Sequence, residues 1–124
     1  MTRSGRHTLA VLATVGLAVL IAYLTLSPPS SGPGLSIPDK LAHFLAFAGL
    51  IFPYALLYRR GLIWMIPIAV LFGGAIEIIQ PNVGRSAELA DFFADVAGVI
   101  AGTAAGYCVD MAVHIQRIRS QDKT

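Results

Sequence analysis

The stretch that decides the fold is GGAIEIIQPNVGRSAELADFFADVAGVIAG, which runs from Gly73 to Gly102. It carries four carboxylates and one arginine between segments that are apolar enough to lie in lipid. Charged side chains at the ends of apolar helices are costly to bury, so their presence indicates a functional site. The residues concerned are Glu77, Arg85, Glu88, Asp91 and Asp95.

The composition predicts an integral membrane protein. Of the 124 residues, 56% are hydrophobic and only 13% are charged, and the mean hydropathy is +0.70. A soluble domain of this length could hardly cover so much apolar surface with polar side chains. The chain is also short enough to form a single domain, which we expect to cover residues 1–124.

Two other classes are excluded by the same composition. The basic residues are scattered over chain ends and loops and form no stripe with interleaved aromatic residues, so we expect no nucleic-acid binding. Cys108 is the single cysteine, which rules out a disulfide framework or a CxxC metal site within the chain.

Apolar runs predict four transmembrane helices, at about 9–26, 41–58, 62–80 and 89–114. Each is close to the length that crosses a hydrocarbon core of about 30 Å at about 1.5 Å per residue. The first run is long for a signal peptide, and the SPPSSGPG segment after it offers no A-x-A cleavage site, so we expect it to remain as an anchor. The sequence therefore predicts an all-α, integral membrane four-helix bundle, with an irregular loop at Ser27–Ile37.

The distribution of basic residues predicts the orientation. Four spans place both termini on one side, and most lysines and arginines fall on that side, so both termini are predicted to be cytoplasmic. These residues are Arg3, Arg6, Arg59, Arg60, Arg117, Arg119 and Lys123, against only Lys40 and Arg85 on the other side.

The outer side then collects most of the ionisable residues. His43, Glu77 and Asp95 each lie about one to one and a half turns inside their spans, so we expect them to face one another and not the lipid. Five acids and two bases give this side a formal charge of minus three, which protons, a cationic His43 or a bound cation would have to offset. Residues three or four apart share a helix face: Asp39 with His43, Glu77 with Gln80, and Asp91 with Asp95.

Small residues recur at every fourth position of the fourth span, which allows close approach of a neighbouring helix. That neighbour is either a helix of the same bundle or another copy, so a homo-oligomer stays open. The residues are Ala90, Ala94, Gly98, Gly102 and Gly106.

Three function classes fit the outer cluster. The first is an enzyme on a lipid-linked or head-group substrate, in which His43 or Glu77 is the general base. The second is a metal-dependent protein with an oxygen-rich site for magnesium, calcium, manganese or zinc. The third is a non-catalytic binding or structural protein, or a small transporter, whose cluster is a packing network. The candidate catalytic residues, which are also the candidate metal ligands, are His43, Glu77, Asp91 and Asp95.

Four further residues are candidates for substrate binding. Gln80 would hold the Glu77 carboxylate or a ligand. Arg85 would clamp an anionic head group, or else pair with an acid to fasten the loop. Lys40 would stabilise negative charge. The set is Asp39, Lys40, Gln80 and Arg85.

Three segments together resemble the VanZ-like family of small bacterial membrane proteins: DKLAHFLAFAGL, GGAIEIIQ and GRSAELADFFADVAGVIAG. The resemblance covers about Asp39 to Gly102, and it implies a bacterial inner (plasma) membrane protein that binds or acts on an envelope lipid, a lipid-linked precursor or a glycopeptide-type head group. The family is named for a protein associated with teicoplanin resistance. Asp95 stands where many relatives have Asn. The polar signature that the resemblance implies is Asp39, Lys40, His43, Glu77, Gln80, Arg85, Asp91 and Asp95.

Overall fold

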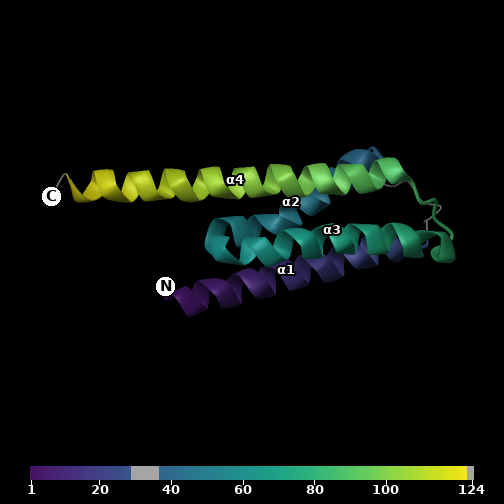
Figure 1. Cartoon of the computed structure of the whole chain (residues 1–124), viewed down its shortest axis with the longest axis horizontal. Helices are drawn as coiled ribbons and strands as arrows, with labels where there is room; N and C mark the ends of the chain where they lie inside the picture. The colour runs from purple at the N-terminus through teal and green to yellow at the C-terminus, as the bar shows by residue number, and fades with distance from the viewer. Residues whose placement is uncertain (29–36, 123–124) are drawn as a thin grey trace.

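The structure, a computed structural model, describes residues 1–28 and 37–122. Within them the chain forms four long helices: α1 (Arg3–Leu26), α2 (Asp39–Leu57), α3 (Leu62–Ile79) and α4 (Leu89–Gln121). The start of α1 and the end of α4 lie at the same end of the bundle (Figure 1). Each helix is long and apolar enough to cross a membrane. The predicted all-α, four-helix architecture is thus confirmed, and most of the predicted loop Ser27–Ile37 lies outside the described residues.

Two helices are longer than their apolar runs. Helix α1 begins at Arg3, where the Thr2 hydroxyl accepts a hydrogen bond from the Gly5 N–H at 3.1 Å and caps the helix. Helix α4 continues past the predicted end at residue 114 to Gln121, because residues 107–121 include no glycine or proline to stop it. Hydropathy marks the part of a helix that suits lipid, whereas backbone hydrogen bonding continues into polar sequence.

Short 3-10 turns connect the last three helices. The turn Arg59–Gly61 joins α2 to α3, and the turn Gln80–Val83 follows α3. Gly84 ends the second turn in the left-handed conformation, with φ of 76°, which glycine adopts without steric cost. This reversal returns the chain along α3, so that the start of α4 lies beside the end of α3 (Figure 1).

The small-residue face of α4 packs against α2. Gly98 and Gly102 are buried, and a Cβ added to either would collide with a backbone carbonyl oxygen of α2, that of Phe44 or of Ala48 respectively. Such close backbone approach requires residues without side chains. The glycine stripe therefore serves packing within the bundle, and it brings the first turns of α2 and α4 together.

The interior is apolar and the outer surface suits lipid. Phe47 and Ile51 of α2 and Ile76 of α3 are almost fully buried in the core. Large aliphatic side chains such as Leu71 and Ile100 are instead exposed around the outside. Exposure of so many large apolar side chains is expected where the solvent is hydrocarbon.

Candidate functional site

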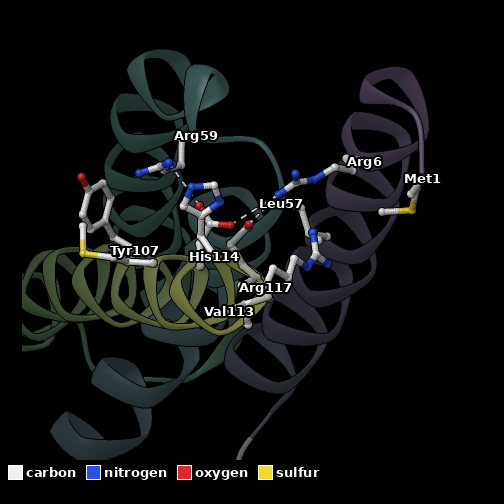
Figure 2. Close-up of a pocket in the computed structure, with 11 residues that line it drawn as sticks. Met1, Arg6, Leu57, Arg59, Tyr107, Val113, His114 and Arg117 are labelled. Carbon is white, nitrogen blue, oxygen red and sulfur yellow. Dashed lines mark hydrogen bonds and ion pairs between the residues drawn. The ribbon is translucent and has the colours of Figure 1, made fainter. Parts of the chain in front are cut away.

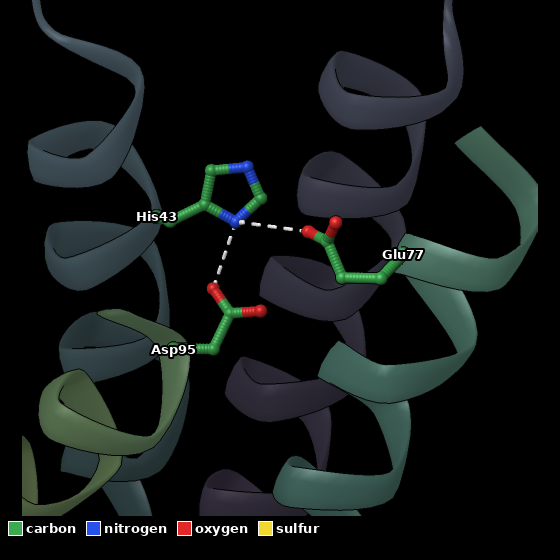
Figure 3. Close-up of side chains that lie close together, drawn as sticks. All are labelled: His43, Glu77 and Asp95. Carbon is green, nitrogen blue, oxygen red and sulfur yellow. Dashed lines mark hydrogen bonds and ion pairs between the residues drawn. The ribbon is translucent and has the colours of Figure 1, made fainter. Parts of the chain in front are cut away.

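Three ionisable side chains from three helices converge (Figure 3). They lie near the start of α4, at the end of the bundle that is opposite the termini (Figure 1). The Nδ1 atom of His43 lies 2.8 Å from Oδ1 of Asp95 and 4.0 Å from Oε1 of Glu77. All three residues offer a ligand atom within 4.8 Å of the others. The predicted convergence of His43, Glu77 and Asp95 is confirmed.

Each side chain is fixed by the helix that carries it. His43 lies in the second turn of α2 and Asp95 in the second turn of α4, the two helices that the glycine face holds together. Glu77 lies in the last turn of α3, and its Oε2 accepts a hydrogen bond of 3.0 Å from the backbone N–H of Glu88, the residue that precedes α4. One carboxylate oxygen of Glu77 thus satisfies a helix-terminal N–H group, and the other faces His43.

Gly73 of α3 makes room for Asp95. A Cβ added at Gly73 would lie 2.8 Å from Oδ2 of Asp95, closer than side-chain atoms normally approach. The Asp95 carboxylate, which is 0% exposed, therefore fills the space that the side chain of any other residue at position 73 would need. The only sign of this role in the sequence is the pair of glycines, Gly73 and Gly74, shortly before the acid Glu77.

The cluster leaves buried acceptors without partners. A ring N–H can donate one good hydrogen bond, and the short contact to Asp95 uses the one on Nδ1. The other ring nitrogen points away from both carboxylates (Figure 3). Among the described residues, four buried side-chain oxygens have no hydrogen-bond partner, although such groups are normally satisfied. They are Glu77 Oε1, Gln80 Oε1, Asp91 Oδ1 and Asp95 Oδ2.

Negative charge is in excess at the site. Lys40 is exposed at the rim, where its Nζ lies 3.1 Å from Oε2 of Glu88 and 4.0 Å from Oδ1 of Asp91. Arg85 turns away, because its Nε donates a 2.8 Å hydrogen bond to the backbone carbonyl of Ser27. The buried carboxylates of Glu77, Asp91 and Asp95 thus have no arginine or lysine in hydrogen-bonding contact with their side chains among the described residues.

Other candidate residues lie outside the cluster. Gln80 is 2% exposed, and its Nε2 donates to the Thr25 carbonyl at 3.3 Å, so it ties α3 to the end of α1 and does not hold the Glu77 carboxylate. Asp39 is the first residue of α2 and is exposed. The buried part of this helix begins only at His43, one turn later. Asp91 is buried but is not among the three converging residues.

Arg85 fastens the loop by a contact that differs from the expected pairing with an acid. The sequence predicts either a clamp on a head group, which stays a prediction, or a pair with an acid such as Glu88 or Asp91, and no such pair forms among the described residues. Instead it bonds the end of α1 to the connection between α3 and α4. The backbone carbonyl of Ser27 is an acceptor that only the tertiary structure brings near.

The converging atoms are suited to hold a divalent cation. One imidazole nitrogen and two carboxylates form a mixed donor set of the kind that zinc and manganese accept. The contacts of 2.8 Å and 4.0 Å from Nδ1 are compatible with ligands that share one ion at about 2.0–2.2 Å each. Unpartnered oxygens of Glu77 and Asp95 lie beside this space. Without an ion, the same atoms form a hydrogen-bonded acid–base pair, His43 with Asp95.

Comparisons with known proteins give no match. No protein-family model matches the chain, and the searches of curated proteins and of solved structures found no match either.

Proposed function

We propose that this chain is a membrane protein of the VanZ-like type that binds a divalent cation between His43, Glu77 and Asp95. Through that cation it binds the phosphate-bearing head group of an envelope lipid or a lipid-linked precursor. The support for a cation is the combination of three ligand atoms within 4.8 Å and buried carboxylate oxygens that have no partner. Buried carboxylates near one another do not all stay ionised unless positive charge is supplied.

A cation held by three protein ligands keeps positions open for water or substrate oxygen. A phosphate oxygen fits such a position because it is a hard, anionic ligand. Lys40 supports the choice of an anion. Its exposed ammonium lies at the rim, and among the described residues its ion pairs are with Glu88 at 3.1 Å and with the more distant Asp91 at 4.0 Å. We infer that Lys40 meets the head group as it approaches the cation.

The proposed topology places both termini in the cytoplasm and the site at the outer leaflet of the bacterial inner membrane. Its support is the distribution of basic side chains. Along the chain they fall mainly at the start of α1, between α2 and α3, and toward the end of α4, all at the termini end of the bundle.

A second function is favoured by one contact. The 2.8 Å hydrogen bond between His43 and the Asp95 carboxylate is the arrangement by which an acid orients a histidine as a general base. In that case the protein would be a metal-independent enzyme on the same class of head group.

Cation binding by the whole chain separates the two functions. We expect the chelator-treated protein, purified in non-ionic detergent, to bind one Mn²⁺ or Zn²⁺ per chain and to melt at a higher temperature when it does, since a ligand that binds only the folded state stabilises it. A polyprenyl phosphate should then bind more tightly with the cation present than without it, with the polyprenyl alcohol as control. Failure to bind Mn²⁺, Zn²⁺ or Mg²⁺ would contradict the proposal and leave the acid–base function.

Alanine at position 73 tests the geometry of the site. In Gly73→Ala the new Cβ would lie 2.8 Å from Oδ2 of Asp95, and the carboxylate must shift. We expect a loss of cation affinity of about 10- to 100-fold, as for changes that disturb the support of metal ligands. The matched control is Gly74→Ala, whose Cβ would make an ordinary 3.7 Å contact with Phe92. Equal affinities of the two variants in calorimetric titration would show that Asp95 is not a ligand.

A further inference from the structure

A second polar site lies at the opposite end of the bundle, where the termini are. It is a cavity of about 550 Å³ lined by residues of α1, α2, α4 and the turn between α2 and α3. The side chains of Arg6, Arg59, His114 and Arg117 gather around this space (Figure 2). The cluster of His43, Glu77 and Asp95 contributes nothing to it.

The cavity is positively charged. Three guanidinium groups, those of Arg6, Arg59 and Arg117, line it together with one carboxylate, that of Asp110. The formal excess is two positive charges with His114 neutral. Arginine is the residue best suited to bind phosphate oxygens, because its planar donors form paired hydrogen bonds.

Two of the three arginines are held in place. Oδ1 of Asp110 lies 3.6 Å from Nη2 of Arg6, and Oδ2 lies 3.2 Å from Nη2 of Arg59. Arg6 also donates to the carbonyl of Leu56 at 3.2 Å, and the Arg59 guanidinium lies 4.6 Å from the centre of the Tyr107 ring. One carboxylate thus positions two guanidinium groups without neutralising the cavity.

Arg117 is the remaining charge. In the described part of the chain, no hydrogen bond or ion pair involves its guanidinium. It lies on the same wall of the cavity as His114, one helical turn along α4 (Figure 2). An anion that entered the cavity would find Arg117 unpaired and two preorganised arginines beside it.

The apolar residues in the cavity wall favour an anion that carries an apolar chain over a small inorganic anion. Leu56, Leu57, Met111 and Val113 line the cavity beside the arginines. Leu57 is the last residue of α2, so the cavity lies where an apolar helix ends and polar sequence begins. This is the level at which lipid head groups meet protein, and basic pockets between transmembrane helices bind anionic head groups there.

We propose that this cavity is a binding site for the phosphodiester head group of an anionic phospholipid. Arg6, Arg59 and Arg117 contact the phosphate, and the leucines and Val113 contact the glycerol and the first acyl carbons. The site is separate from the one at the other end, and its existence does not depend on the proposed cation.

Lipid competition measured by native mass spectrometry tests this site. The full chain in non-ionic detergent is offered an equal mixture of phosphatidylglycerol and phosphatidylcholine, and we expect phosphatidylglycerol to be retained preferentially. Arg117→Gln should lower its affinity about fivefold, since one basic residue near the head group contributes about 1 kcal/mol and about 1.4 kcal/mol is tenfold. Because Arg117→Gln breaks no side-chain hydrogen bond or ion pair with a described residue, the variant is expected to fold normally.

The matched control is Arg119→Gln, two residues further along α4 at a position that does not line the cavity. It should bind phosphatidylglycerol as the unchanged protein does. Arg117→Lys, which keeps the charge but loses the paired hydrogen bonds, should lose less affinity than Arg117→Gln. Equal losses in the Arg117 and Arg119 variants would overturn the proposal in favour of a diffuse surface charge. Retention of both lipids alike would also overturn it, and competition by equimolar inorganic phosphate would show that the site takes a free anion instead.

Discussion

The Asp95→Asn variant is expected to lose measurable divalent-cation binding while keeping its fold. Asparagine has nearly the same size, and its carbonyl oxygen still accepts the hydrogen bond that His43 Nδ1 makes at 2.8 Å. What it lacks is the charge that a divalent cation requires from its ligands. Loss of one anionic ligand of three should lower the affinity by about 100-fold or more, given that even outer-shell changes cost about 10- to 100-fold.

The melting temperature of the metal-free variant tests the same assignment in a second way. Removing a buried carboxylate that the cation no longer balances should leave the chelator-treated Asp95→Asn protein as stable as the original or more stable. The increase in melting temperature on adding Mn²⁺ or Zn²⁺ should vanish. The matched control is Asp39→Asn, an exposed acid at the same end of the bundle, which should keep the increase. A chelated Asp95→Asn protein that melts well below the original would instead mean that the charged pair only stabilises the fold.

Alanine at Gly102 is expected to separate α2 from α4. Its Cβ would overlap the carbonyl oxygen of Ala48 and lie 2.7 Å from the Ala48 Cα, and backbone atoms cannot rotate aside. Overpacking of this kind costs about 1–3 kcal/mol, and we expect the upper part of that range because whole helices must move. The same movement would draw His43 away from Asp95.

The control for this variant is Gly49→Ala. Both glycines lie within helices, but a Cβ at Gly49 meets no atom within 4 Å. Alanine there should raise the free energy of unfolding by about 0.5–1 kcal/mol through helix propensity alone. Thermal melts in one detergent would give the two values. A lower free energy of unfolding for Gly102→Ala and a higher one for Gly49→Ala would confirm that Gly102 is needed for the backbone contact between α2 and α4. A Gly102→Ala variant with an unchanged free energy of unfolding would contradict this role.

Periodicity predicted the elements well because it depends on local chemistry. Runs of apolar residues of bilayer length identified all four helices. The depth of His43, Glu77 and Asp95 within their spans sufficed to predict that they converge. An ionisable side chain placed that deep has no solvent on the lipid side, so only the bundle interior remains for it.

Side-chain contacts between segments that are distant in the sequence could not be predicted from hydropathy and spacing. Nothing near Arg85 in sequence indicates that it bonds the carbonyl of Ser27, 58 residues away. Nor does the pairing of Arg6 with Asp110 leave a pattern in the sequence, because their helices are first and last in the chain. A side chain's partner is chosen by helix rotation and crossing, which depend on all the packed residues together.

The sequence by itself determined that this protein is a bundle of apolar helices with a buried acidic and histidine cluster near one end, since hydropathy and residue spacing are local properties. Only the tertiary structure decided which atoms meet there: His43 with Asp95 at 2.8 Å, Glu77 turned toward Glu88, and Gly73 left bare for a carboxylate. The physical reason is that glycine contacts set how closely α2 and α4 approach. A small shift between these helices would break the hydrogen bond between His43 and Asp95.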